Sequence, residues 1–122
     1  MSIEITEVGH VNVTVPPDLE QAAKRFYGDI LGLPQIQKPE GPRQFIGAWY
    51  QIGNTQLHLS LEDDPQNSSS DRHVCYRVHD LNVAAEELRT AGFEVIPDGQ
   101  PARKSSRFFV RDPAGNMIEI SE

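Results

Sequence analysis

The sequence has very little cysteine, since Cys75 is the only one in 122 residues. A single cysteine rules out a disulfide within the chain and a zinc site built from several thiolates. No apolar run approaches the roughly 20 residues of a membrane-spanning helix, so we expect no membrane partner. Basic residues are also scarce, 11 against 18 acidic ones, and the formal charge of −7 argues against binding to nucleic acid.

The start of the chain carries no targeting signal, because residues 1–4 lack the basic and apolar regions of a secretory signal peptide. We therefore expect a cytoplasmic protein. The length suits one domain with a real hydrophobic core. We predict a single domain over residues 1–122, made of one half at about 5–61 and a second half at about 72–122, joined by a polar linker.

The two halves repeat one pattern. Polar and apolar residues alternate from His10 to Val15 and again from His73 to Val78, which predicts a strand in each half. Apolar residues at helical spacing follow each strand, and Asp18 and Asp80 stand where each helix would be capped. The other predicted strands are 35–37, 45–52 and 56–60 in the first half, and 94–96, 107–111 and 117–121 in the second. The sequence thus predicts an α+β fold in which strand, helix and three strands occur twice.

Alternation also predicts which side chains share a face of a strand. The valines and leucines of the first and last strands should pack under the helices. The opposite faces carry His10, His58, His73 and Glu119 at equivalent positions of the two halves. If the first and last strands of each half are neighbours, these four side chains converge. Imidazole and carboxylate groups together suit Fe, Mn, Ni, Co or Zn as a divalent ion, with open positions for a substrate.

Four residues of the predicted strands need separate interpretation. His58 is a fourth metal ligand, an acid/base group or a polar wall of the cavity. Cys75 lies on the face of His73, and we interpret it as a small buried filler. Trp49 and Tyr50 are neighbours on a strand, so only one of them can point into the cavity.

Three segments of the chain resemble the vicinal-oxygen-chelate superfamily, which contains glyoxalases, bleomycin-resistance proteins and extradiol dioxygenases. The resemblance covers residues 9–122. It rests on Gly9 to Val15 with the Phe26-Tyr27…Leu31-Gly32 stretch, on Arg72 to Val78, and on Asp112-Pro113-Ala114-Gly115-Asn116-Met117-Ile118-Glu119. It implies paired βαβββ modules that form a half-barrel-like mixed sheet with helices on the outer face. It also implies metal ligation by His10, His73 and Glu119, and homodimers whose sites combine modules of both chains.

The resemblance further implies a small-molecule substrate whose oxygen coordinates the metal. Charged or polar groups must hold the rest of that substrate, and an inward-facing set of arginines would select an anion. The candidates are Arg77 and Asn12 on the polar faces, Arg107 and Arg111 on a strand bordering the site, and Arg103 in a loop.

The ligand set favours a metal-dependent enzyme of lyase, isomerase, thiol-transferase or dioxygenase type, with Glu119 and His58 as catalytic residues. The alternative is a metal-free protein that sequesters a ligand, as bleomycin-resistance proteins do. A ring-cleaving dioxygenase is a third hypothesis, although those enzymes usually have four modules. At the position of His58, glyoxalase I usually has a glutamate, so a standard glyoxalase I is less well supported.

Overall fold

Each half of the protein folds into a strand, a helical segment and three further strands. A computed structural model describes residues 2–42, 46–99 and 106–122. In the first half these elements are β1 (His10–Val15), the helical turns η1 (Pro17–Leu19), α1 (Glu20–Arg25) and η2 (Phe26–Ile30), then β2 (Gln35–Ile36), β3 (Ala48–Ile52) and β4 (Thr55–Leu61). After the short turn η3 (Asn67–Ser69), the second half contains β5 (His73–Arg77), α2 (Leu81–Thr90), β6 (Ile96–Pro97), β7 (Arg107–Arg111) and β8 (Met117–Ser121).

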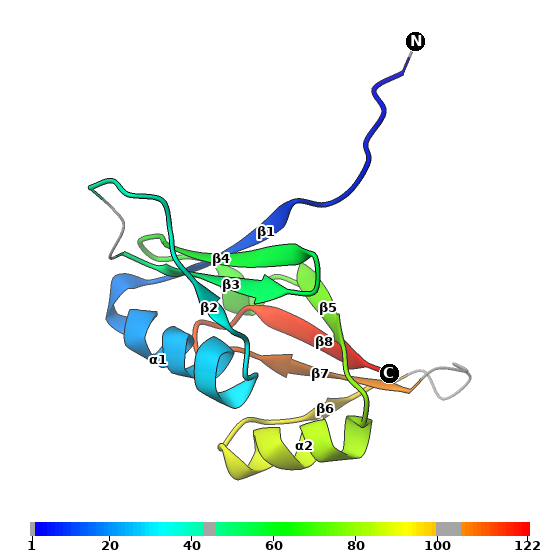
Figure 1. The fold of residues 1–122 in the computed structure, drawn as a ribbon. Helices are drawn as coiled ribbons and strands as arrows, with labels where there is room; N and C mark the ends of the chain where they lie inside the picture. Colours follow the sequence, from blue (N-terminus) through cyan, green and yellow to red (C-terminus); the bar gives the residue numbers. More distant parts are fainter. Residues whose placement is uncertain (1, 43–45, 100–105) are drawn as a thin grey trace.

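The strands form two four-stranded sheets of the same topology. Their orders are β1-β4-β3-β2 and β5-β8-β7-β6. In each sheet the first and last strands of the half pair in parallel, and the remaining pairs are antiparallel. The predicted adjacency of first and last strands, and the predicted α+β class, are confirmed. In Figure 1, α1 lies beneath the first sheet and α2 beneath the second.

The two helical segments begin differently. Asp80 caps α2, because its side chain accepts a hydrogen bond from the backbone N–H of Val83 at 3.1 Å. The predicted cap at Asp18 is wrong. Asp18 lies inside the 3₁₀ turn η1, which starts with proline, and neither η1 nor α1 has a side-chain cap. Proline in this first turn supplies a preset φ angle, so the chain enters the helix without a side-chain cap.

One hydrophobic core joins the helices to the sheets. Alternation places Val15, Leu57 and Leu59 on the helix side of the first sheet, and Ile118 and Ile120 on that of the second. All five are at most 2% exposed, as the sequence pattern predicts. The opposite face of each sheet carries the predicted polar side chains, His10 and His58 on the first sheet and His73 and Glu119 on the second, and we call it the open face.

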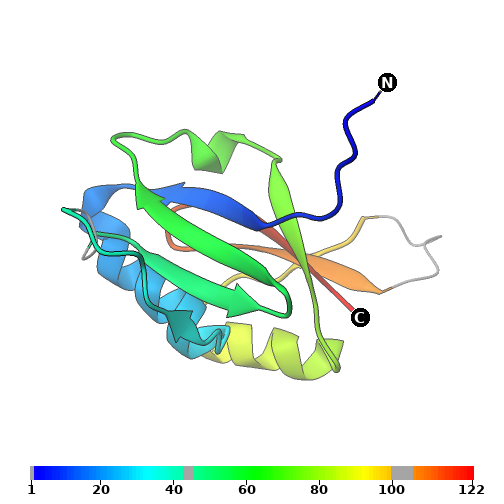
Figure 2. The same cartoon turned by 45° about the horizontal axis from the view of Figure 1, so that its top comes forward.

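Two further features concern the N-terminal segment and the lengths of the helices. Residues 2–9 lead into β1 and extend away from the sheets in both ribbon views (Figure 1, Figure 2), with Ile3 and Ile5 90% and 85% exposed. Within the described ranges, no helix is long and apolar enough to cross a membrane.

Candidate functional site

The open face of the second sheet brings His73 and Glu119 into contact. Nε2 of His73 lies 3.1 Å from Oε1 of Glu119. Glu119 is 8% exposed, although it stands on the open face, because neighbouring side chains cover it. Cys75 lies opposite Glu119 in the strand register, and its Sγ donates to Oε2 at 3.5 Å.

The tautomer of His73 is set by its second nitrogen. Nδ1 lies 2.9 Å from the backbone carbonyl oxygen of Asp71, which can only accept a hydrogen bond. In the neutral imidazole Nδ1 therefore carries the proton, and Nε2 presents a lone pair to the Glu119 carboxylate. Two acceptors that face each other need a cation between them, either a proton or a metal ion. A backbone carbonyl behind the ring is also the usual partner of a metal-binding histidine.

Arg107 and Asp98 complete this group of side chains. Nη1 of Arg107 is 3.2 Å from Oε1 of Glu119, and its Nε is 2.9 Å from Oδ2 of Asp98. Burial works to raise the pKa of Glu119, but the hydrogen bond from Cys75 and the charge of Arg107 outweigh it, so the pKa lies below its usual value. The hydrogen bond to Asp98 is the main cause that raises the pKa of Arg107.

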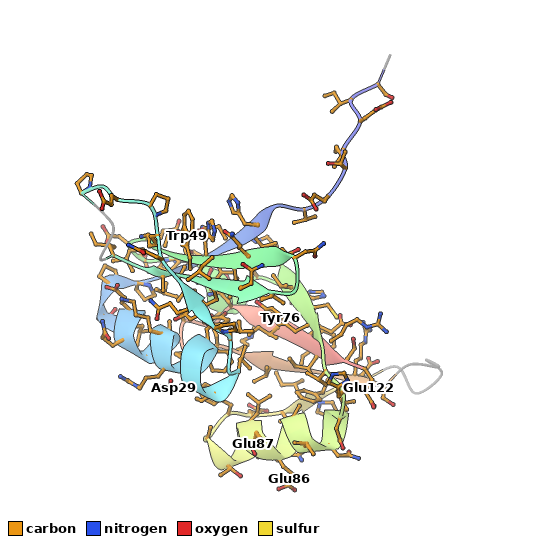
Figure 3. All side chains as sticks on the ribbon, in the orientation of Figure 1. Asp29, Trp49, Tyr76, Glu86, Glu87 and Glu122 are labelled. Carbon is orange, nitrogen blue, oxygen red and sulfur yellow. The ribbon has the colours of Figure 1, made fainter. Side chains whose placement is uncertain are left out.

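The open face of the first sheet holds a stack of three rings. The His58 ring lies between Trp49, with centroids 3.8 Å apart, and His10, with centroids 4.1 Å apart. Trp49 stands on the side of this sheet opposite α1 (Figure 3), whereas its neighbour Tyr50 is buried among core residues. Of these two aromatic residues, Trp49 is thus the one on the open face.

The surroundings of His58 favour the neutral form of its ring. Its Nε2 lies 2.9 Å from Oε1 of Gln56, an acceptor, so Nε2 donates this hydrogen bond. Burial is the largest cause that lowers the pKa of His58, and electrostatic interaction with His10 and Lys38 adds to the effect. The hydrogen bond to Gln56 therefore occupies Nε2 of His58.

The four predicted ligands meet as two pairs and not as one cluster. His10 contacts His58 on the first sheet, and His73 contacts Glu119 on the second. Throughout the described residues, no group of three or more His, Cys, Asp or Glu side chains is arranged to hold a metal ion. The donor chemistry of the second pair, an imidazole nitrogen beside a carboxylate oxygen, fits a divalent metal.

A cavity of about 320 Å³ lies between the two halves, and His73 of the second pair is part of its lining. It is bordered by polar side chains from both halves, which include Asn12, Thr14, Glu62, Arg72 and His73. Apolar side chains of the neighbouring strands, such as Val13, Val74 and Ile118, also line it. Its mixed lining suits a small polar molecule.

The predicted substrate-binding residues have different surroundings. Arg77 is exposed, and its guanidinium donates to the backbone carbonyl of Glu122 at 3.0 Å. Asn12 donates to Ser60 at 2.9 Å beside the cavity. Arg111 donates to the backbone carbonyls of Asn67, Ser70 and Gly115, which holds the linker against β7 and the turn before β8 and leaves less of the guanidinium for a ligand. Arg103 lies outside the described residues.

Sequence reasoning missed three features of this region. No sequence pattern indicated a role for Asp98, because its contact with Arg107 depends on the pairing of β6 with β7. The ring stack was not predicted either, although alternation allowed Trp49 to share the face of His58. The interpretation of Cys75 as buried is wrong, because its side chain is exposed.

The fold and the site define an α+β protein of two βαβββ halves whose open polar faces carry histidines and a buried carboxylate. A family model described as the Glyoxalase/Bleomycin resistance protein/Dioxygenase superfamily matches residues 7–120. The chain therefore belongs to this superfamily, the vicinal-oxygen-chelate proteins.

Individual relatives agree with this assignment. An ethylmalonyl-CoA/methylmalonyl-CoA epimerase from Cereibacter sphaeroides is 30% identical over 109 residues, which cover 80% of this chain and 79% of the relative. A protein from Bacillus anthracis described as glyoxalase family has 35% identity and a TM-score of 0.85, and the match covers 100% of this chain and 98% of that one. A lactoylglutathione lyase from Agrobacterium tumefaciens has the same fold, with 21% identity, a TM-score of 0.73 and coverage of 98% and 95%.

Proposed function

We propose that this protein is a metal-dependent isomerase whose site binds one divalent ion through His73 and Glu119 of one chain and His10 of a second copy. The observation that carries the proposal is that Nε2 of His73 lies 3.1 Å from Oε1 of Glu119, while Nδ1 of the same ring lies 2.9 Å from the backbone carbonyl oxygen of Asp71. Metal bonds to imidazole nitrogen and carboxylate oxygen are about 2.0–2.2 Å, so two ligands of one ion lie roughly 3 Å apart.

The second copy supplies what one chain lacks. His10 is exposed on the open face of the other sheet and occupies in its half the position that His73 has in the second. Within the described pairing, β1 and β5 are edge strands, and an open sheet edge next to an open polar face favours cover by another subunit. The proposal therefore includes a homodimer.

The reaction class follows from the relative named as an epimerase. Inverting a stereocentre next to a thioester carbonyl requires that a proton be removed and returned. A bound divalent metal would supply a Lewis acid for the negative charge that develops on the carbonyl oxygen. We propose an anionic acyl thioester as the substrate class for this chain.

The residues of this chain have separate roles in such a reaction. Neutral His58 can accept a proton at neutral pH, because its pKa is lowered. Glu119 serves as a ligand and stays ionised, because its pKa is also lowered. Asn12 borders the cavity, and Arg77 lies on the face of His73, so both are placed to hold polar or anionic parts of the substrate.

Three wider parts of the proposal concern the whole protein. The ion is Fe, Mn, Ni, Co or Zn, the ions that His and carboxylate ligands suit. A cytoplasmic location fits a chain with one unpaired cysteine. The two halves, about 5–61 and about 72–122, act as one domain because a common core joins their helices and sheets.

A metal-free ligand-binding protein is the second candidate. The ion pair between Arg107 and Glu119 favours it, since the carboxylate already has a cationic partner. In that case the cavity would hold a ligand that no metal ion coordinates. A measurement of metal affinity distinguishes the two candidates.

The first test is a titration of chelator-treated protein with Zn(II), Ni(II), Co(II), Mn(II) and Fe(II). We expect about one tightly bound ion per chain. Glu119→Gln should weaken binding far more than it lowers the melting temperature, because it removes a ligand while keeping the shape. If none of these ions binds, the metal-dependent proposal is wrong and the metal-free candidate replaces it.

Mixing two variants tests whether a site combines two chains. His10→Ala and His73→Ala should each bind no metal as homodimers. A mixed dimer contains one site that has lost both histidines and one that has lost neither, so mixing should restore binding to about half of the mixed dimers' sites. If mixing restores nothing although mixed dimers form, all ligands come from one chain.

The reaction itself is tested by proton exchange. An alkylmalonyl thioester incubated in D₂O with metal-loaded protein should incorporate deuterium next to the carbonyl, measured by mass spectrometry. His58→Phe keeps a ring in the stack but removes the proton acceptor, and should slow exchange by about 10²-fold or more. Absence of exchange with metal-loaded parent protein would contradict isomerase chemistry on this substrate class.

A further inference from the structure

Two groups converge on one oxygen atom of Glu119. Oε1 lies 3.1 Å from Nε2 of His73 and 3.2 Å from Nη1 of Arg107. The guanidinium therefore sits against the same oxygen that a metal shared with His73 would use. A cation and a guanidinium that compete for one carboxylate oxygen repel each other at short range.

Asp98 offers Arg107 a second anionic partner on the other side. Nε of Arg107 lies 2.9 Å from Oδ2 of Asp98, so the guanidinium bridges the two carboxylates. The side chains of Arg107, Asp98 and Glu119 are only 15%, 13% and 11% exposed, and solvent screens their charges weakly. The guanidinium also lies 5.1 Å from the ring centre of Phe109, which stands opposite Glu119 in the register of β7 and β8.

We propose that Arg107 is a built-in competitor for the metal, and that Asp98 is the partner that retains Arg107 when a metal takes its place at Glu119. This inference rests on the proposed metal site and concerns its regulation. Without metal, the guanidinium neutralises the buried carboxylate. When an ion binds, Nη1 leaves Oε1 while Nε stays on Asp98, which frees Nη1 to face the open side of the sheet.

The arrangement gives two substitutions with opposite effects. Arg107→Gln removes the competitor, so metal should bind more tightly. Asp98→Asn removes the charge that retains Arg107, so the guanidinium should hold Glu119 more firmly and metal should bind more weakly. A residue that merely orients Glu119 for the metal would show the reverse effect for Arg107→Gln.

The experiment is a competition titration with Zn(II) on the purified full-length protein. We expect Kd to fall on the order of tenfold for Arg107→Gln and to rise on the order of tenfold for Asp98→Asn. Arg77→Gln is the matched control, because it removes the same charge from the same sheet face without a contact to Glu119. It should leave Kd within about twofold. Thermal unfolding checks that each variant is folded. If Arg107→Gln does not fold, Asp98→Asn tests the inference by itself.

The double variant decides whether Asp98 acts through Arg107. In the Arg107→Gln background, Asp98→Asn should change Kd by less than about twofold, whereas a direct effect of the Asp98 charge on the metal would persist. Persistence of the full effect overturns the role of Asp98. Equal Kd values for Arg107→Gln, Arg77→Gln and the parent overturn the inference but leave the metal site intact. No Zn(II) binding by the parent or any variant overturns both.

Discussion

His58 illustrates how the surroundings of one residue set its chemistry. The ring is 7% exposed and lies between the rings of Trp49 and His10. Because burial disfavours the charged form, the pKa of His58 is lowered in the folded protein. The same effect that favours the neutral ring also makes the free energy of unfolding depend on pH.

We expect metal-free protein to lose stability as the pH falls below about 6.5, the ordinary pKa of histidine. Below that pH the unfolded chain binds a proton at His58 and the folded chain does not, so the free energy of unfolding decreases until the lowered folded pKa is reached. One proton limits the slope to about 1.4 kcal/mol per pH unit. Glu20 and Glu119, whose pKa values are also lowered, lose their contributions only below the ordinary pKa of glutamate.

Urea unfolding between pH 7.5 and 5, followed by the fluorescence of Trp49, measures this dependence, because Trp49 is the only tryptophan. His58→Phe should flatten the slope in that range, since phenylalanine can stack but cannot titrate. An unchanged slope in this variant would assign the pH dependence to other groups.

At the scale of elements, the two helical segments differ in how their first turns are satisfied. Asp80 accepts the N–H of Val83 and begins α2, which has ten residues. The first half instead enters through η1 and continues through α1 into the π-helical turn η2, with no side-chain cap on any of the three. Equivalent aspartates in the repeat therefore have unequal roles.

Asp80→Ala should destabilise the protein by about 1 kcal/mol, because it leaves an N–H of the first turn without its partner. Asp18→Ala is the matched control and should cost less than about 0.5 kcal/mol, since Asp18 makes no cap. Chemical denaturation of both variants gives the comparison. Equal losses would show that the hydrogen bond of Asp80 contributes nothing specific.

At the scale of the whole molecule, buried polar contacts join the two halves. The hydroxyl of Tyr27, from η2, donates to Oδ2 of Asp112 in the second half at 2.6 Å. Asp112 also accepts the backbone N–H groups of Ala114 and Asn116, which closes the turn before β8. Burial and the charge of Asp112 raise the pKa of Tyr27, so its hydroxyl remains a donor at any ordinary pH. This turn leads directly to the strand that carries Glu119.

Tyr27→Phe should destabilise the protein by about 1.5–3 kcal/mol, because a buried carboxylate loses a donor from the other half. Tyr50→Phe is the control: its hydroxyl makes only a 3.4 Å contact with a backbone carbonyl, and its loss should cost less than about 1 kcal/mol. Both ring systems remain, so packing is preserved in each variant. A larger loss for Tyr50→Phe would contradict this account of how the halves are joined.

The repeat of strand, helix and three strands was predictable because it rests on local patterns. Alternation between His10 and Val15 predicts both the strand and its faces, and β7 and β8 have the predicted bounds. Side chains two residues apart on a strand share a face whatever the rest of the fold does. The helix start at Asp18 was not predictable from the cap pattern, since proline in the first turn provided another way to begin.

By itself, the sequence determined the class of fold, the buried faces, and the set of polar side chains on the open faces, because periodicity acts within a few residues. Only the tertiary structure decided how those side chains combine. Strand register and rotamers stack His58 between Trp49 and His10, direct Arg107 to both Asp98 and Glu119, and turn Arg111 toward linker carbonyls. These contacts join residues far apart in the chain or across a hairpin, so their free energies depend on pairing that no local pattern encodes.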